Sequence, residues 1–123
     1  MRDALVLLVA ASFAGMGALA LARPATILKQ VGVAVETSAG RNEVRAVYGG
    51  FGLAVAALLA VAALGNPATA EGIVIAVAFA LLGMAGGRLA SAAAERPAGL
   101  YPIWVFFAFE VVAGAALLAV VWG

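Results

Sequence analysis

Four long apolar runs, separated by short polar segments, dominate the sequence. The runs cover residues 4–22, 44–64, 72–89 and 103–122. As α-helices they would be about 27–32 Å long, which matches a bilayer hydrocarbon core of roughly 30 Å. The pattern therefore predicts an all-α fold: an integral membrane four-helix bundle of two antiparallel hairpins, forming a single four-span domain over residues 1–123.

The segment between the first two runs has a different pattern. Pro24 suits the first position of a short helix, in which Ile27 and Leu28 form the apolar side and Gly32 marks the end. Such a helix is typical of chain that lies in the plane of the membrane surface. We interpret residues 24–41 as a short interfacial segment between the first and second spans.

The first run also has a feature of secretory signal peptides. The residues Ala20-Leu21-Ala22 fit a small-x-small cleavage site. However, the run is longer than the roughly 7–15 apolar residues of a signal peptide, and Asp3 offsets the positive charge of Arg2. We therefore favour a helix that is retained as a membrane span.

Composition supports a membrane class and narrows the chemistry. The chain is 67% hydrophobic and 11% charged, whereas soluble domains are about 45–50% apolar and roughly 25% charged. A net charge of +1 without a basic cluster argues against nucleic acid as a partner. Cysteine and histidine are absent, which removes disulfides, thiol nucleophiles, imidazole bases and the usual zinc ligands. No metal site and no cofactor is predicted.

The cations are distributed unevenly between the two sides of the predicted bundle. Arg2 is the one cation on the side of the N-terminus and of the connection after the second run. The opposite side carries Arg23, Lys29, Arg41, Arg45, Arg88 and Arg96. Because cytoplasmic loops carry the excess of Lys and Arg, this pattern predicts a multi-pass protein of the bacterial inner membrane with both termini periplasmic.

Ionisable residues enter the apolar runs at three positions, Arg45, Arg88 and Glu110. Glu110 is about 10 Å inside the fourth run, where a charged side chain costs on the order of 2.5–3.5 kcal/mol and usually has a partner. Tyr48 shares a helix face with Arg45 and its hydroxyl could bridge the charges. The predicted polar or ligand-binding cluster comprises Asn42, Glu43, Arg45, Tyr48, Arg88 and Glu110. The alternative for Glu110 is a salt bridge that only fixes helix register.

Glycines occur where the predicted helices would need to approach one another closely. Gly49 and Gly50 stand at the start of the second run, beside the polar residues. Gly83 and Gly87 form a GxxxG pattern in the third run. Small residues at this spacing are common at helix–helix contacts in membranes, so we predict helix-packing roles for all four glycines.

The run from Asn42 to Gly50 has the pattern Asn-Glu-x-Arg-Ala-x-Tyr-Gly-Gly. It resembles the signature of a family of small bacterial four-helix integral membrane proteins of unknown function. Pro24 after the first span, Arg88 at the end of the third and Glu110 in the fourth fit the same pattern. The resemblance covers nearly the whole chain and implies an inner-membrane four-helix protein without an assigned activity.

Three functions are compatible with these features. The first is a non-enzymatic accessory or ligand-binding bundle, whose partners are membrane lipids or a lipid-like small molecule such as a quinone. The second is a small transporter or proton-coupled channel that uses Glu110, although small drug exporters place their glutamate in the first span. The third is an isomerase-type membrane enzyme with Glu110 as the acid–base group. Four small helices expose much surface, so a homo-oligomer or a subunit of a larger membrane complex also fits.

Overall fold

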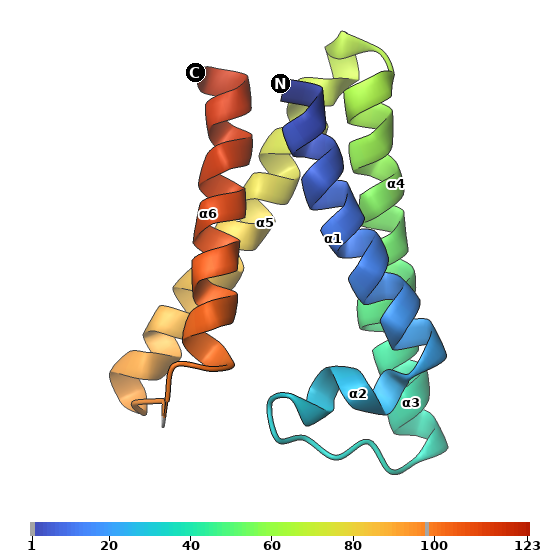
Figure 1. Ribbon diagram of the computed structural model, residues 1–123, viewed down its shortest axis with the longest axis vertical. Coiled ribbons are helices and arrows are strands. Elements are labelled where there is room, and N and C mark those ends of the chain that lie inside the picture. The colour runs from blue at the N-terminus through green and yellow to red at the C-terminus, as the bar shows by residue number, and fades with distance from the viewer. Residues whose placement is uncertain (1, 98) are drawn as a thin grey trace.

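The computed structural model describes residues 2–97 and 99–123, which form helices joined by short connections (Figure 1). The elements in chain order are α1 (Arg2–Ala22), α2 (Pro24–Lys29), α3 (Ser38–Val44), the π-helical segment η1 (Arg45–Gly50), α4 (Phe51–Leu64), α5 (Pro67–Ala94) and α6 (Ile103–Trp122). Because α3, η1 and α4 are continuous, the described residues form 4 helical stretches long and apolar enough to cross a membrane. This confirms the predicted all-α class with four spans.

The third long helix begins earlier than the sequence pattern predicts, at Pro67. The side chain of Asn66 accepts a hydrogen bond of 2.8 Å from the N–H of Ala68 and so caps the helix. Proline is well suited to the first helical position because the N–H it lacks would have no partner there. The helix therefore extends beyond the apolar run at residues 72–89, and only Gly65 and Asn66 separate α4 from α5.

A short helix and an extended segment connect α1 to the second long helix. As predicted, α2 begins at Pro24. Gly32 follows it with a φ of 78°, a conformation that favours glycine. The Thr37 hydroxyl then accepts a hydrogen bond of 3.0 Å from the N–H of Gly40 and caps α3. Ser38 is the first residue of this helix.

The long helices form two antiparallel hairpins, α1 with α4 and α5 with α6 (Figure 1). The hairpins meet near both chain termini, at what we call the closed end, where α4 contacts α5 and α1 contacts α6. They diverge towards the splayed end, which carries α2, α3 and the connection from α5 to α6. The residues at the centre of the buried core include Val6, Val9, Val55, Leu59, Val74, Ala78, Leu81 and Leu117. Most of the core therefore lies in the half of the molecule near the closed end.

The first hairpin is held together by very close backbone contact at glycine. A Cβ placed on Gly17 of α1 would lie 2.8 Å from the carbonyl oxygen of Gly49 and 2.9 Å from the backbone nitrogen of Leu53. A Cβ on Gly49 would in turn lie 2.9 Å from Cδ2 of Leu21. No larger residue fits at Gly17 without moving α1 away from η1 and α4.

The second hairpin packs on the face of α5 that carries Ala78 and Leu82. Gly114 of α6 faces α5, since a Cβ there would lie 2.8 Å from Cγ of Leu82 and 3.2 Å from the carbonyl oxygen of Ala78. A Cβ on Gly83 or Gly87 would meet nothing within 4 Å. These two glycines therefore do not face another helix among the described residues, and a packing role for them stays a prediction.

Replacing Gly17 by alanine should weaken the first hairpin. The methyl group would meet backbone atoms of η1 and α4, which cannot rotate away as a side chain can. Overpacking of this kind costs about 1–3 kcal/mol of unfolding free energy. The matched control is Gly15→Ala in the same helix, where a Cβ meets nothing within 4 Å. Thermal unfolding of the purified variants in detergent checks this, and equal stability of the two would contradict it.

Candidate functional site

Glu110 is the one charged residue of α6, and it lies in the middle of an otherwise apolar helix. Its relative exposure is 3%. It lies about 10 Å from the start of the helix, and because its side chain is buried within the protein, bulk water does not solvate the carboxylate. A carboxylate in this environment needs a partner from a neighbouring helix.

Arg88 of α5 is that partner. Its Nε donates to Oε2 of Glu110 at 2.8 Å and its Nη2 donates to Oε1 at 2.7 Å. This parallel two-bond arrangement is the strongest geometry available to a guanidinium and a carboxylate. The ring of Phe106, one turn before Glu110, lies 5.4 Å from Cζ of Arg88 and adds a cation–π contact. The predicted buried salt bridge is confirmed for this pair.

Arg45, the other candidate partner, is used elsewhere. Its Nε donates to the carbonyl oxygen of Leu21 at 3.1 Å. That carbonyl belongs to the last turn of α1, where backbone oxygens have no partner within their own helix. A cation is also favoured at this end of a helix by the helix dipole. Arg45 therefore caps α1 and does not contact Glu110, which corrects the prediction of a single cluster containing both arginines.

The signature run lies on α3 and the π-helical segment η1. The widened turn is visible in its hydrogen bonding, because the N–H of Phe51 reaches back five residues to the carbonyl of Ala46. Short π-helical segments are rare in helices and are frequent at functional sites. A Cβ on Gly50 would meet only the carbonyl oxygen of Arg45, at 3.8 Å and in the same segment. The predicted packing of Gly50 against another helix is therefore not observed.

The other signature residues lie outside the ion pair. Asn42 and Glu43 are exposed on α3, and Tyr48 on η1 is half-buried. Within the described residues the Tyr48 hydroxyl makes no hydrogen bond, neither to Arg88 nor to Glu110. Glu43 and Tyr48 line a hollow of about 530 Å³ between η1 and the connection from α2 to α3. Of the predicted cluster, only Arg88 and Glu110 are bonded to each other.

One contact between the two hairpins is not predicted by the sequence. The hydroxyl of Tyr101, just before α6, donates to Oε1 of Gln30, just after α2, at 3.0 Å. Within the described residues it is the one side-chain hydrogen bond that joins the two hairpins, and it does so at the splayed end. The ring of Tyr101 also packs edge-on against Phe106, with centroids 6.1 Å apart. Tyr101 lies just before the fourth apolar run, where an aromatic residue commonly anchors a helix at the membrane interface. Nothing in the sequence indicates that its partner is Gln30.

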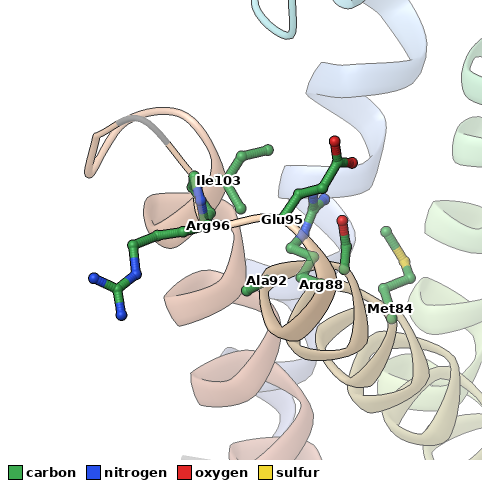
Figure 2. A pocket seen from close by; sticks show the side chains of 9 residues that line it. Met84, Arg88, Ala92, Glu95, Arg96 and Ile103 are labelled. Carbon is green, nitrogen blue, oxygen red and sulfur yellow. The ribbon is translucent and has the colours of Figure 1, made fainter.

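A hollow of about 620 Å³ borders the ion pair at the splayed end of α5 (Figure 2). The residues that line it include Met84, Gly87, Arg88, Ser91, Glu95 and Arg96. Figure 2 shows Met84 on one side and Ile103 on the other, with the side chains of Arg88 and Glu95 between them. The guanidinium of Arg96 extends away from Arg88. The hollow therefore combines apolar walls with one anchored cation and one carboxylate.

The chemistry that these groups can perform is binding by hydrogen bonds and charge. Among the described residues no group of three or more His, Cys, Asp or Glu side chains is arranged to hold a metal ion. The chain contains no cysteine or histidine to act as a nucleophile or base. Arg88, with a side-chain exposure of 25%, presents the N–H groups that Glu110 does not use.

Four membrane-length apolar helices, with an ion pair between the last two, define a small multi-pass membrane protein of the all-α class. The family model of a domain of unknown function, DUF4345, matches residues 1–122. The chain belongs to this family. No curated protein and no solved structure matches the chain. Membership agrees with the predicted uncharacterised family and assigns no activity, so any function has to be argued from the site.

Loss of the Arg88 side chain should destabilise the protein more than loss of the Glu110 side chain. In Arg88→Ala the carboxylate of Glu110, at 3% exposure, has no partner, and breaking a buried pair in this way costs about 3–5 kcal/mol. In Glu110→Ala the guanidinium of Arg88 can turn towards lipid headgroups. The double variant Arg88→Met/Glu110→Met should recover most of the loss, because apolar replacements of a buried pair are often tolerated.

Thermal and denaturant unfolding in detergent provides the measurement for these three variants. Unfolding free energies that are equal for the two single variants would contradict the asymmetry. A double variant as unstable as Arg88→Ala would show that the salt bridge itself stabilises the protein, beyond avoiding an unpaired buried charge.

Proposed function

We propose that this membrane protein binds an amphiphilic small molecule in the hollow beside Arg88 and serves as a binding or accessory module, not as an enzyme. The observation that carries this proposal is an anchored guanidinium at the edge of an apolar-walled hollow. A lipid-like molecule, such as a membrane lipid or a quinone, has the matching chemistry. The volume of about 620 Å³ falls within the roughly 300–1,000 Å³ typical of small-molecule sites.

The ion pair prepares Arg88 for a ligand. Two hydrogen bonds to Glu110 fix the plane of the guanidinium, so less side-chain freedom is lost when a ligand binds. The remaining N–H groups can donate to a carbonyl or phosphate oxygen. Met84, Gly87 and Ile103 supply the apolar surface for the rest of the molecule.

The same geometry disfavours the two other functions. Both carboxylate oxygens of Glu110 accept hydrogen bonds from Arg88, so a proton could bind Glu110 only by breaking a two-bond ion pair. A proton-coupled transporter or an isomerase needs a group that takes up and releases protons readily. Proton flux through the purified protein in vesicles, abolished in Glu110→Gln, would favour the transporter instead.

We also propose that the protein resides in a bacterial inner membrane with both termini in the periplasm. The support is the position of the cations, since every Lys and Arg except Arg2 belongs to the side that carries α2, α3 and the connection from α5 to α6. The excess of cations marks the cytoplasmic side.

Single-cysteine labelling tests this orientation, because the natural chain has no cysteine to interfere. We expect Ala68→Cys, at the start of α5, to react with a membrane-impermeant maleimide added outside intact cells. Ser38→Cys, at the start of α3, should react only after the membrane is permeabilised. Both positions are exposed in the folded protein. The reverse pattern would overturn the proposed orientation.

Filling the hollow should remove the ligand without unfolding the protein. In Gly87→Leu the new side chain enters open space, because a Cβ at Gly87 meets nothing within 4 Å. We expect this variant to lose an amphiphile that copurifies with the natural protein, as measured by native mass spectrometry. The matched control is Gly72→Leu, equally open but at the other end of α5 and outside the hollow. Retention of the same amphiphile in both variants would contradict the proposed function.

A further inference from the structure

The groups that line the hollow follow a definite order along the last turns of α5. Met84 and Gly87 come first and are apolar or lack a side chain, Arg88 and Ser91 follow with hydrogen-bond donors, and Glu95 stands just after the helix ends. At about 1.5 Å per residue, Glu95 is about 10 Å beyond Arg88 along the helix axis. The order along the helix is therefore apolar surface, donors and then a carboxylate.

The length of α5 places this order at a membrane surface. The helix has 28 residues, or about 42 Å, which exceeds a hydrocarbon core of roughly 30 Å and matches the about 40–45 Å of a bilayer with its headgroups. When α5 crosses a bilayer, its last turns lie in the headgroup layer. Glu95 then stands near the outer boundary of that layer, and the backbone of Arg88 lies slightly below its inner boundary, from where the long side chain can reach the layer.

A phospholipid presents the complementary order from the membrane interior outwards: acyl chain, ester and phosphate oxygens, and then the terminal group of the headgroup. The chain would lie against Met84 and Gly87. The N–H groups of Arg88 that Glu110 does not use match phosphate oxygens. The hydroxyl of Ser91, one turn further along, can donate to the same oxygens.

Glu95 determines which terminal group fits. Its carboxylate lines the hollow and forms no ion pair within the described residues. It would attract an ammonium group and repel an anionic headgroup. The cation nearest to it in sequence, Arg96, extends away from Arg88, so it does not neutralise the inner part of the hollow (Figure 2).

We propose that the hollow binds a zwitterionic phospholipid whose headgroup ends in a primary amine, with the phosphate against Arg88 and the ammonium against Glu95. The proposal rests on the proposed function, because it names the ligand class of the same site. A primary ammonium donates hydrogen bonds to the Glu95 carboxylate, whereas a quaternary ammonium cannot.

Competition between lipids tests the headgroup. The full-length protein in detergent is incubated with equal amounts of phosphatidylethanolamine, phosphatidylglycerol and phosphatidylcholine that carry the same acyl chains, and retained lipid is measured by native mass spectrometry. We expect phosphatidylethanolamine to be retained about two- to fivefold over each of the others, as for an exposed ion pair. The phosphatidylcholine arm separates a primary amine from any zwitterionic headgroup.

Two isosteric variants identify the residue responsible. Glu95→Gln keeps the shape of the side chain and should reduce the preference for phosphatidylethanolamine over phosphatidylglycerol to about equal retention. Glu71→Gln, an exposed glutamate near the other end of α5, should keep the full preference. An equal loss of preference in both variants would overturn the assignment to Glu95.

The outcomes distinguish this inference from the proposed function. Equal retention of all three lipids by the natural protein, with loss of all three in Gly87→Leu, would overturn the headgroup assignment alone. A preference for phosphatidylglycerol that disappears in Arg96→Gln would also overturn it and would identify an anionic lipid. Lipid retention in Gly87→Leu equal to that of the natural protein would overturn the proposed function itself.

Discussion

The ion pair between Arg88 and Glu110 is the interaction on which the arrangement of the second hairpin and of the candidate site depends. A carboxylate within an apolar helix is costly without a partner, so the pair determines which faces of α5 and α6 meet at that depth. The contact of Gly114 with Leu82 then brings the two helices close together further along the hairpin. A guanidinium fixed in this way keeps donors available at the edge of the hollow, and the proposed binding function relies on these donors.

The first hairpin is stabilised by different means. Gly17 allows the backbone of α1 to touch that of η1 and α4, and Arg45 caps the last turn of α1. The run from Asn42 to Gly50 thus has a structural role in joining two helices, because it supplies both Arg45 and Gly49. Polar residues that the sequence predicts to form one cluster are separate in the structure. Arg45 caps helix α1 in the first hairpin, whereas Arg88 and Glu110 form an ion pair in the second.

The core and the polar groups occupy opposite halves of the molecule. The aliphatic core joins the hairpins near the closed end, whereas the splayed end has the ion pair, both hollows and a single side-chain hydrogen bond, from Tyr101 to Gln30, between the hairpins within the described residues. Regions with few buried apolar contacts open at the lowest free-energy cost. A ligand at the splayed end can therefore be accommodated without disturbing the core.

The sequence by itself determined the four spans, the short helix after Pro24 and the need of Glu110 for a cation, because hydropathy and the cost of a buried charge act locally. It left Arg45 and Arg88 as equal candidates. Only the tertiary structure decided between them, exposed the face of α5 that carries Gly83 and Gly87, and brought Tyr101 to Gln30. The physical reason is that helices apolar on every side do not encode which face turns inward. That choice is made by contacts between residues far apart in the chain.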